Sequence, residues 1–144
     1  MIELSLLDRA IVTATEAHSG QTDKAGAPYI LHPLRLMASM ATEAERVTAL
    51  LHDVAEDSQG WDVRRIADEF GSEVGAAVDA VTKRDGEDYD AYLSRVEANP
   101  IAVKVKLADL TDNSDMSRLK HTTEKDKDRL RKYQLAISRL MKAD

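Results

Sequence analysis

Apolar residues recur at three- and four-residue steps along most of the chain, and this spacing restricts its fold more than any other feature. Near the N-terminus Leu4, Leu7, Ile11, Ala14 and Ala17 follow the pattern, which places them on one face of an α-helix. The chain has only six glycines and three prolines, and they fall between the periodic segments, as helix stops and starts do. The sequence therefore predicts an all-α fold.

This punctuation divides the chain into about eight helices within a single domain, residues 1–144. An irregular loop over residues 20–29 follows the first helix, and a polar connection over residues 83–88 separates two later ones. The helix that begins at Ile101 opens with β-branched residues that also fit a short strand, but its context favours a helix. The expected helices cover residues 4–17, 34–40, 43–57, 63–70, 72–81, 89–98, 101–113 and a last segment from 123 or 124 to the end.

Composition narrows the possible functions. The chain lacks cysteine, which excludes disulfides, thiolate zinc sites and a cysteine nucleophile. A net charge of -6 disfavours nucleic-acid binding. The apolar runs are too short to cross a membrane, and no secretion signal opens the chain, so we expect a cytoplasmic protein. Apolar residues such as Met37, Met40 and Trp61 leave a homodimer open.

Four ionisable residues follow one another closely near the end of the expected helix 43–57. Helical spacing places His52 over Glu56 and Asp53 over Asp57. Such groups are costly to bury on a helix that also carries many apolar residues, and a divalent cation would compensate that cost. Spacing alone equally allows a solvated polar stripe at the end of a buried helix.

Two further polar residues sit in apolar surroundings. His32 follows an apolar segment and precedes Pro33, and Asp109 follows a strongly apolar helical stretch. A lone buried histidine is more often a core residue bonded to a backbone carbonyl. Taken with His52 and Asp53, however, the pair completes a ligand set of two nitrogens and two oxygens that suits Mn²⁺, Fe²⁺ or Zn²⁺.

The other two histidines, His18 and His121, have no such companions. We interpret them as helix-end residues.

The order of these residues resembles the H…HD…D signature of the HD metal-dependent phosphohydrolases. Longer segments resemble the hydrolase domain of RelA/SpoT proteins and the stand-alone small alarmone hydrolases, over about residues 3–141. The matching segments are residues 17–21, 24–33, 50–57, 70–71, 81–83 and 105–109. The resemblance implies a helical HD fold of about eight helices around one metal site. It also implies hydrolysis of the 3′-pyrophosphate of (p)ppGpp-like alarmones, usually with Mn²⁺.

Carried over position by position, the resemblance assigns roles to ten residues. The metal ligands would be His32, His52, Asp53 and Asp109, and the residues that orient and deprotonate the attacking water would be Glu56 and Asp57. The substrate contacts would be Lys24, Asn113, Arg129 and Tyr133. Simpler readings remain: Glu56 and Asp57 as a helix-end acidic pair, Lys24 as a solvated loop charge, and Tyr133 as a core residue.

Three acidic residues depart from the pattern of the alarmone hydrolases. Asp23 stands where a basic residue usually stacks on the guanine, and Asp112 and Asp115 follow the last expected ligand. If these carboxylates faced the pocket they would repel a tetraphosphate, and Asp23→Arg would strengthen binding of ppGpp. The base and the phosphate count therefore stay open. The alternatives are another nucleotide as substrate, or an HD module that senses a nucleotide without turnover.

Overall fold

The computed structural model describes residues 3–57 and 60–144, with the backbone alone of residue 57. Over these residues every regular element is a helix, apart from an isolated antiparallel bridge between Thr22 and Pro28. The helices are α1 (Leu6–Ala17), α2 (Leu31–Ala38), α3 (Glu43–Leu51), α4 (Val54–Asp57), α5 (Val63–Phe70), α6 (Ser72–Val81), α7 (Tyr89–Glu97), α8 (Pro100–Asn113), the 3-10 helix η1 (Met116–Arg118) and α9 (Glu124–Met141). The all-α prediction is confirmed, and the segment from Ile101 is helical.

Side-chain caps set many of the helix starts. Thr42 and Glu45 form the reciprocal hydrogen bonds of a capping box at α3, and Asp62 and Asp88 accept backbone N–H groups at the starts of α5 and α7. A further capping box at Ser5 makes α1 begin at Leu6, two residues later than periodicity alone predicts.

The second helix begins earlier than predicted. It starts at Leu31 and not at Leu34, so that His32 and Pro33 lie in its first turn. Proline is tolerated there because the N–H groups of the first turn have no partner within the helix. The early start places the His32 side chain on a rigid element.

The predicted helix over residues 43–57 is wrong in one respect, because it breaks at His52 and Asp53 and resumes as α4. The His52 ring nitrogen Nδ1 lies 2.7 Å from the carbonyl oxygen of Ala49. In a continuous helix that carbonyl accepts the N–H of residue 53, so the side chain competes with the helix where it breaks. His52 and Asp53 are thus presented from a turn, and not from the continuous helix on which they were expected to lie over Glu56 and Asp57.

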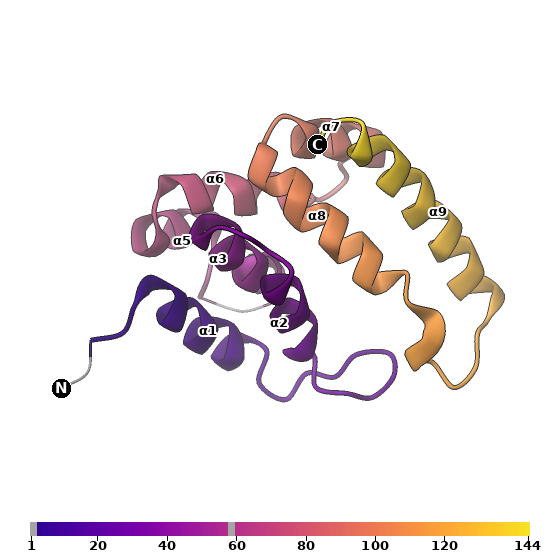
Figure 1. The fold of residues 1–144 in the computed structure, drawn as a ribbon, viewed down its shortest axis with the longest axis horizontal. Coiled ribbons are helices and arrows are strands. Elements are labelled where there is room, and N and C mark those ends of the chain that lie inside the picture. Colours follow the sequence, from indigo (N-terminus) through magenta and orange to yellow (C-terminus); the bar gives the residue numbers. More distant parts are fainter. Residues whose placement is uncertain (1–2, 58–59) are drawn as a thin grey trace.

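Helix α8 joins two parts of the core. It runs between the α1–α6 group and the α7–α9 pair (Figure 1) and contacts α2, α3, α6, α7 and α9. One apolar cluster centres on α3 and includes Leu50 and Ile66, and another lies between α8 and α9 and includes Val103 and Leu140. The start of α2 and the end of α3 therefore lie against the C-terminal half of α8, where the polar residues described below meet.

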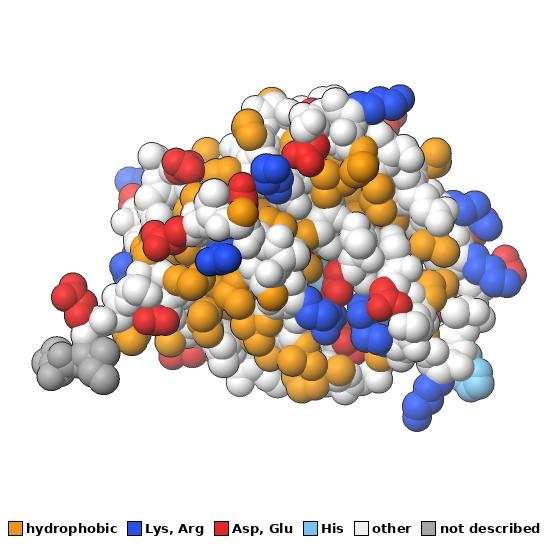
Figure 2. Space-filling view, viewed as in Figure 1, with side chains coloured by type: hydrophobic (Ala, Val, Ile, Leu, Met, Phe, Trp, Pro, Cys, Tyr) orange, Lys and Arg blue, Asp and Glu red, His pale blue; other side chains and the backbone are white. Residues whose placement is uncertain are grey.

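The surface mixes charged and apolar side chains over the face seen in Figure 2. Among the described residues, none of the helices has the length and apolar character needed to cross a membrane.

Close packing of α5 on α6 depends on Gly75. A Cβ at this position would lie 2.5 Å from the Cβ of Ala67. We expect Gly75→Ala to lower the free energy of unfolding by about 1–3 kcal/mol, the usual range for overpacking, although alanine is the better helix former. Urea denaturation measures the change, with the exposed Ala76→Gly as a control for helix propensity. A more stable Gly75→Ala variant would show that α5 can move away.

Candidate metal centre

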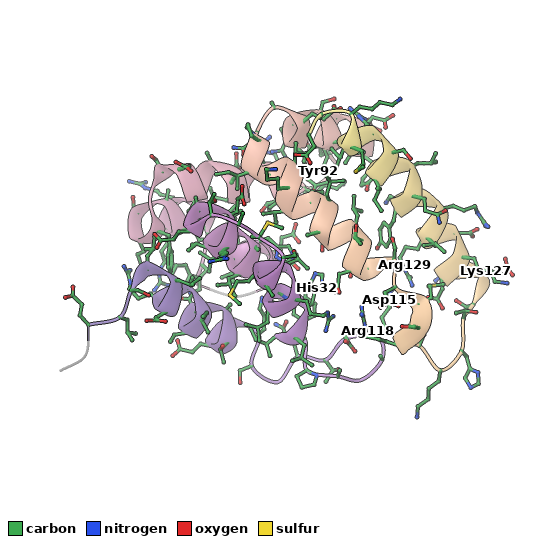
Figure 3. The ribbon with its side chains drawn as sticks, in the orientation of Figure 1. His32, Tyr92, Asp115, Arg118, Lys127 and Arg129 are labelled. Carbon is green, nitrogen blue, oxygen red and sulfur yellow. The ribbon has the colours of Figure 1, made fainter. Side chains whose placement is uncertain are left out.

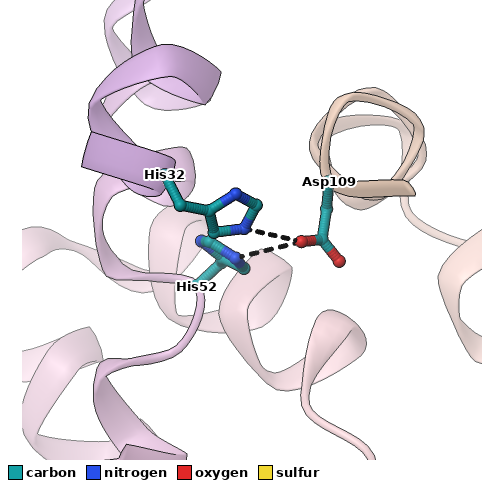
Figure 4. A group of neighbouring side chains, drawn as sticks. All are labelled: His32, His52 and Asp109. Atoms are coloured by element: carbon teal, nitrogen blue, oxygen red, sulfur yellow. Dashed lines mark hydrogen bonds and ion pairs between the residues drawn. The ribbon is translucent and has the colours of Figure 1, made fainter. Parts of the chain in front are cut away.

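Three buried side chains from separate elements converge near the C-terminal end of α8. His32 of α2, His52 at the end of α3 and Asp109 of α8 each offer a ligand atom, and these atoms lie within 4.8 Å of one another. Nε2 of His32 is 2.9 Å from Oδ1 of Asp109, and Nε2 of His52 is 3.5 Å from the same oxygen (Figure 4). The three residues are 4%, 4% and 7% exposed, so the cluster is sheltered from bulk water.

Hydrogen bonds on the far side of each imidazole orient the two histidines. The carbonyl of Ala49 can only accept, so Nδ1 of His52 donates to it and Nε2 of the neutral ring carries the lone pair. Nδ1 of His32 lies 2.6 Å from Oδ2 of Asp112, again an acceptor. When both rings are neutral with the proton on Nδ1, both Nε2 lone pairs point toward Asp109.

This arrangement fits a divalent cation. Two lone pairs that face an anionic oxygen repel it unless a proton or a metal ion lies between them, and Nε2 of His52 has no hydrogen-bond partner among the described residues. Burial lowers the pKa of His52, but Asp53 and Asp109 raise it by more, to well above its ordinary value. The site thus attracts positive charge strongly, and imidazole and carboxylate are suitable ligands for it.

Asp53 lies at the edge of this cluster. Its Oδ2 is 3.0 Å from Nε2 of His52, and the hydroxyl of Tyr29 donates to the same carboxylate. Burial raises the pKa of Asp53, but the nearby charge of His52 lowers it to about 2. The structure therefore brings three of the four expected ligands within mutual ligand distance and places the fourth, ionised, beside them.

Asp109 has two further partners on its own helix. Nζ of Lys106 is 2.9 Å from Oδ2 of Asp109, and the amide of Asn113 donates to Oδ1 at 3.1 Å. Burial raises the pKa of Asp109, but Lys106 and the histidines lower it well below its usual range. Sequence reasoning missed Lys106, although its place three residues before Asp109 is a spacing at which side chains meet on a helix.

Two cavities flank Tyr133. The inner cavity, of about 320 Å³, is lined by residues of the metal cluster and by Glu56, Lys83, Lys106 and Lys132. The outer cavity, of about 350 Å³, is bounded by the loop before α2, η1 and the start of α9. All four predicted substrate residues line the outer cavity: Lys24, Asn113, Arg129 and Tyr133.

The predicted pair of water-activating residues is described only in part. Glu56 is exposed and lines the inner cavity. The side chain of Asp57 lies outside the described residues.

The acidic residues that depart from the alarmone-hydrolase pattern form ion pairs or hydrogen bonds with neighbouring groups. Asp115 pairs with Arg118 at 3.1 Å, on the η1 side of the outer cavity, near Arg129 (Figure 3). Asp112 lines neither cavity and pairs with Arg35 at 2.8 Å. The condition under which Asp112 would repel a tetraphosphate, that it faces the pocket, is therefore not met for either cavity.

Asp23 has a structural role in the loop before α2. Its Oδ1 accepts the backbone N–H groups of Ala25 and Ala27, each at 2.9 Å. The carboxylate thus holds the turn that carries Lys24 to the outer cavity.

The two histidines outside the cluster differ from each other. His18 ends α1 as predicted, but it is buried, at 2% exposure, with its ring 4.8 Å from that of Tyr29 and its Nδ1 3.0 Å from Gln21. His121 is exposed in the connection between η1 and α9. The helix-end interpretation thus needs correction for His121, which lies outside any helix.

A family model described as an HD domain matches residues 10–141. The chain belongs to the HD-domain family. HD domains are metal-dependent, and the His32, His52 and Asp109 group is a possible site for that metal.

Curated relatives of this HD domain are long proteins. A probable GTP pyrophosphokinase of Mycobacterium leprae is 35% identical over 76% of this chain and 16% of its own length. A guanosine-3′,5′-bis(diphosphate) 3′-pyrophosphohydrolase of Vibrio cholerae is 34% identical over 77% of this chain and 18% of its own length. This chain thus spans less than a fifth of either relative.

A solved structure supports the same fold. It belongs to a metazoan orthologue of SpoT described as hydrolysing ppGpp, and it matches 97% of this chain and 87% of its own with a TM-score of 0.75 at 22% identity. The predicted HD fold is confirmed.

Proposed function

We propose that this HD domain is a Mn²⁺-dependent hydrolase that removes the 3′-pyrophosphate of a (p)ppGpp-like nucleotide. The observation that carries the proposal is a buried His–His–Asp cluster that opens into a cavity with three lysines. The names of the relatives, one of them a 3′-pyrophosphohydrolase, support the choice of substrate.

In this proposal different residues bind the metal, accept the proton of the attacking water and position the ligands. His32, His52 and Asp109 hold the metal, with Asp53 as the fourth ligand. A bound divalent cation lowers the pKa of a coordinated water and polarises a phosphoryl oxygen. Glu56, with Asp57 beside it in the sequence, takes the proton of the attacking water. Tyr29, through its hydrogen bond, keeps Asp53 at the edge of the cluster.

The charge of the inner cavity favours a phosphate group there. Lys83 and Lys132 both line it, and neither has an ion-pair partner among the described residues. Lys132 lies over the ring of Tyr89, with Nζ 4.1 Å from the centroid. Two free ammonium groups next to a metal position can bind the phosphoryl groups as point charges, while the nucleoside occupies the outer cavity.

The proposal is tested by incubating the Mn²⁺-loaded protein with ppGpp, ppApp, nucleoside triphosphates and nucleoside monophosphates, and separating the products by chromatography. The expected products of ppGpp are GDP and pyrophosphate. If the protein turned over another nucleotide faster than ppGpp, that nucleotide would be the substrate of the same site. Nucleotide binding without product formation would show a sensing module.

We expect the double variant Lys83→Met, Lys132→Met to raise KM for the preferred nucleotide about 30-fold, with a smaller change in kcat. Each lost charge-assisted contact is worth roughly 1 kcal/mol at a partly exposed site. Steady-state kinetics measure the change, with Lys127→Met as the matched control because Lys127 lies on the same helix and pairs with Glu124. An unchanged KM would place the phosphates elsewhere.

The structure also changes the expectation for Asp23→Arg. Because the Asp23 carboxylate holds two backbone N–H groups of its loop, we now expect the substitution to weaken nucleotide binding by about tenfold. Loss of these bonds costs roughly 1–2 kcal/mol of loop order. Titration of nucleotide into the protein checks this, with Asp23→Asn as the control that keeps the accepting oxygen. Tighter binding of ppGpp by Asp23→Arg would restore the idea that this position faces the base.

A further inference from the structure

Asp112, in the last turn of α8, points at α2 and away from both cavities. Its Oδ2 lies 2.6 Å from Nδ1 of His32. Its two oxygens also lie 2.8 and 2.9 Å from Nε and Nη2 of Arg35. The carboxylate is only 13% exposed, so these contacts are sheltered from water.

The contact with His32 determines which ring nitrogen is free. A carboxylate accepts hydrogen bonds, so Nδ1 of His32 donates to Asp112 and, in the neutral ring, Nε2, 2.9 Å from Asp109, is the nitrogen that can offer its lone pair to a cation. His52 achieves the same orientation through the neutral carbonyl of Ala49. His32 alone of the two has a charged acceptor, which makes the ring a stronger electron donor at Nε2.

Arginine contacts keep this carboxylate in place. The two parallel bonds to Arg35 form a fork that fixes the plane of the carboxylate. Nη2 of Arg118 lies 3.6 Å from Oδ2 and donates to the backbone carbonyl of Asp112 at 2.9 Å. Burial raises the pKa of Asp112, but the bonds from Arg35 and His32 lower it below its usual value. The group is therefore an ionised and immobile acceptor.

We propose that Asp112 is a positioning residue of the metal centre, which holds the His32 imidazole with Nε2 turned toward the metal and raises the affinity of the centre for its cation. The inference rests on the proposed metal site. It gives a role to an acidic residue that departs from the alarmone-hydrolase pattern.

The test measures metal binding directly. Purified wild-type protein, Asp112→Ala and Asp112→Asn are stripped of metal and titrated with Mn²⁺ by calorimetry and with Co²⁺ by visible absorption. We expect Asp112→Ala to weaken binding of both ions by about 10- to 100-fold, the usual effect of losing such a partner, and to change the Co²⁺ spectrum. Asp112→Asn keeps a neutral acceptor and is expected to restore part of the affinity.

Two controls separate positioning from general structure. Asp115→Asn removes a nearby carboxylate that also pairs with Arg118 but does not contact His32, and it is expected to bind both ions as the wild type does. Arg35→Gln breaks the fork between α2 and α8 but leaves the His32 contact, and it is expected to lose less affinity than Asp112→Ala. Equal losses of metal affinity in Arg35→Gln and Asp112→Ala would mean that Asp112 only holds α2 and α8 together, which overturns the proposal.

The remaining outcomes are distinct. Wild-type affinity and spectrum in Asp112→Ala would overturn the positioning role while leaving the metal centre intact. Failure of the wild type itself to bind Mn²⁺ or Co²⁺ would overturn the metal centre and this inference together. Should Asp112→Ala fail to fold, the comparison of Asp112→Asn with Asp115→Asn decides, and equal affinities in that pair would overturn the proposal.

Discussion

His52→Ala and Asp109→Asn are each expected to remove bound metal and hydrolytic activity together. The two side chains offer Nε2 and Oδ1 to the same point, and loss of either removes a ligand from the centre of the proposed site. Elemental analysis and turnover measure the two effects. Asparagine replaces Asp109 because its amide oxygen can still accept a hydrogen bond from the ammonium of Lys106, 2.9 Å away, whereas alanine offers no acceptor.

The same variants should lose the stabilisation that metal gives. With Mn²⁺ at about 100 times Kd, binding to the folded state alone adds roughly 2.7 kcal/mol, a rise in Tm of several degrees for a chain of this size. We expect this rise in the wild type and not in His52→Ala. The matched control is His18→Ala, another buried histidine, which lies outside the cluster and should keep its metal while losing stability. Wild-type metal content in both site variants would contradict the assignment.

The helices were predictable because they depend on local signals. Apolar spacing and the caps at Thr42, Asp62 and Asp88 act within one or two turns, and the structure contains each of them. The break at residues 52–53 was not predictable in this way. It depends on a side chain that bonds to its own backbone while its other nitrogen faces Asp109 on α8.

The residues of the candidate site also divide into those that local sequence signals indicate and those that depend on packing between helices. Buried polar residues in apolar surroundings indicated His32, His52 and Asp109, and the structure brings these three together. The partners Lys106 and Asp112 were missed or misjudged, because the direction of an acidic side chain near a helix end depends on which helix packs against it. Asp112 faces α2, and no sequence spacing encodes that contact.

Several expectations from the sequence stay predictions, among them the single domain over residues 1–144, the cytoplasmic location, the possible homodimer and Mn²⁺ as the metal. The location depends on the cell, and a homodimer depends on a second copy of the chain. The roles of Glu56 and Asp57 also stay predictions, and they are open to a direct kinetic test.

Glu56→Gln and Asp57→Asn are expected to lower kcat by about 10²-fold or more, the usual scale for loss of a general base, while bound metal and the fold stay unchanged. Glu56 lines the inner cavity with the metal cluster but is not one of the three residues within mutual ligand distance. A carboxylate so placed can accept the proton of an attacking water without holding the cation. The amide keeps the size of the side chain and removes only its basicity, so KM should change little.

The control for this pair is Glu73→Gln, an exposed glutamate in the first turn of α6, which should turn over as the wild type does. Loss of metal in Glu56→Gln would instead make Glu56 a ligand, and activity would then fall for the same reason as in His52→Ala. Wild-type turnover in both Glu56→Gln and Asp57→Asn would mean that these residues are only a solvated acidic pair at a helix end. The proton of the attacking water would then have to pass to another group that lines the inner cavity. Asp53, an ionised carboxylate 3.0 Å from Nε2 of His52, is the candidate beside the metal cluster.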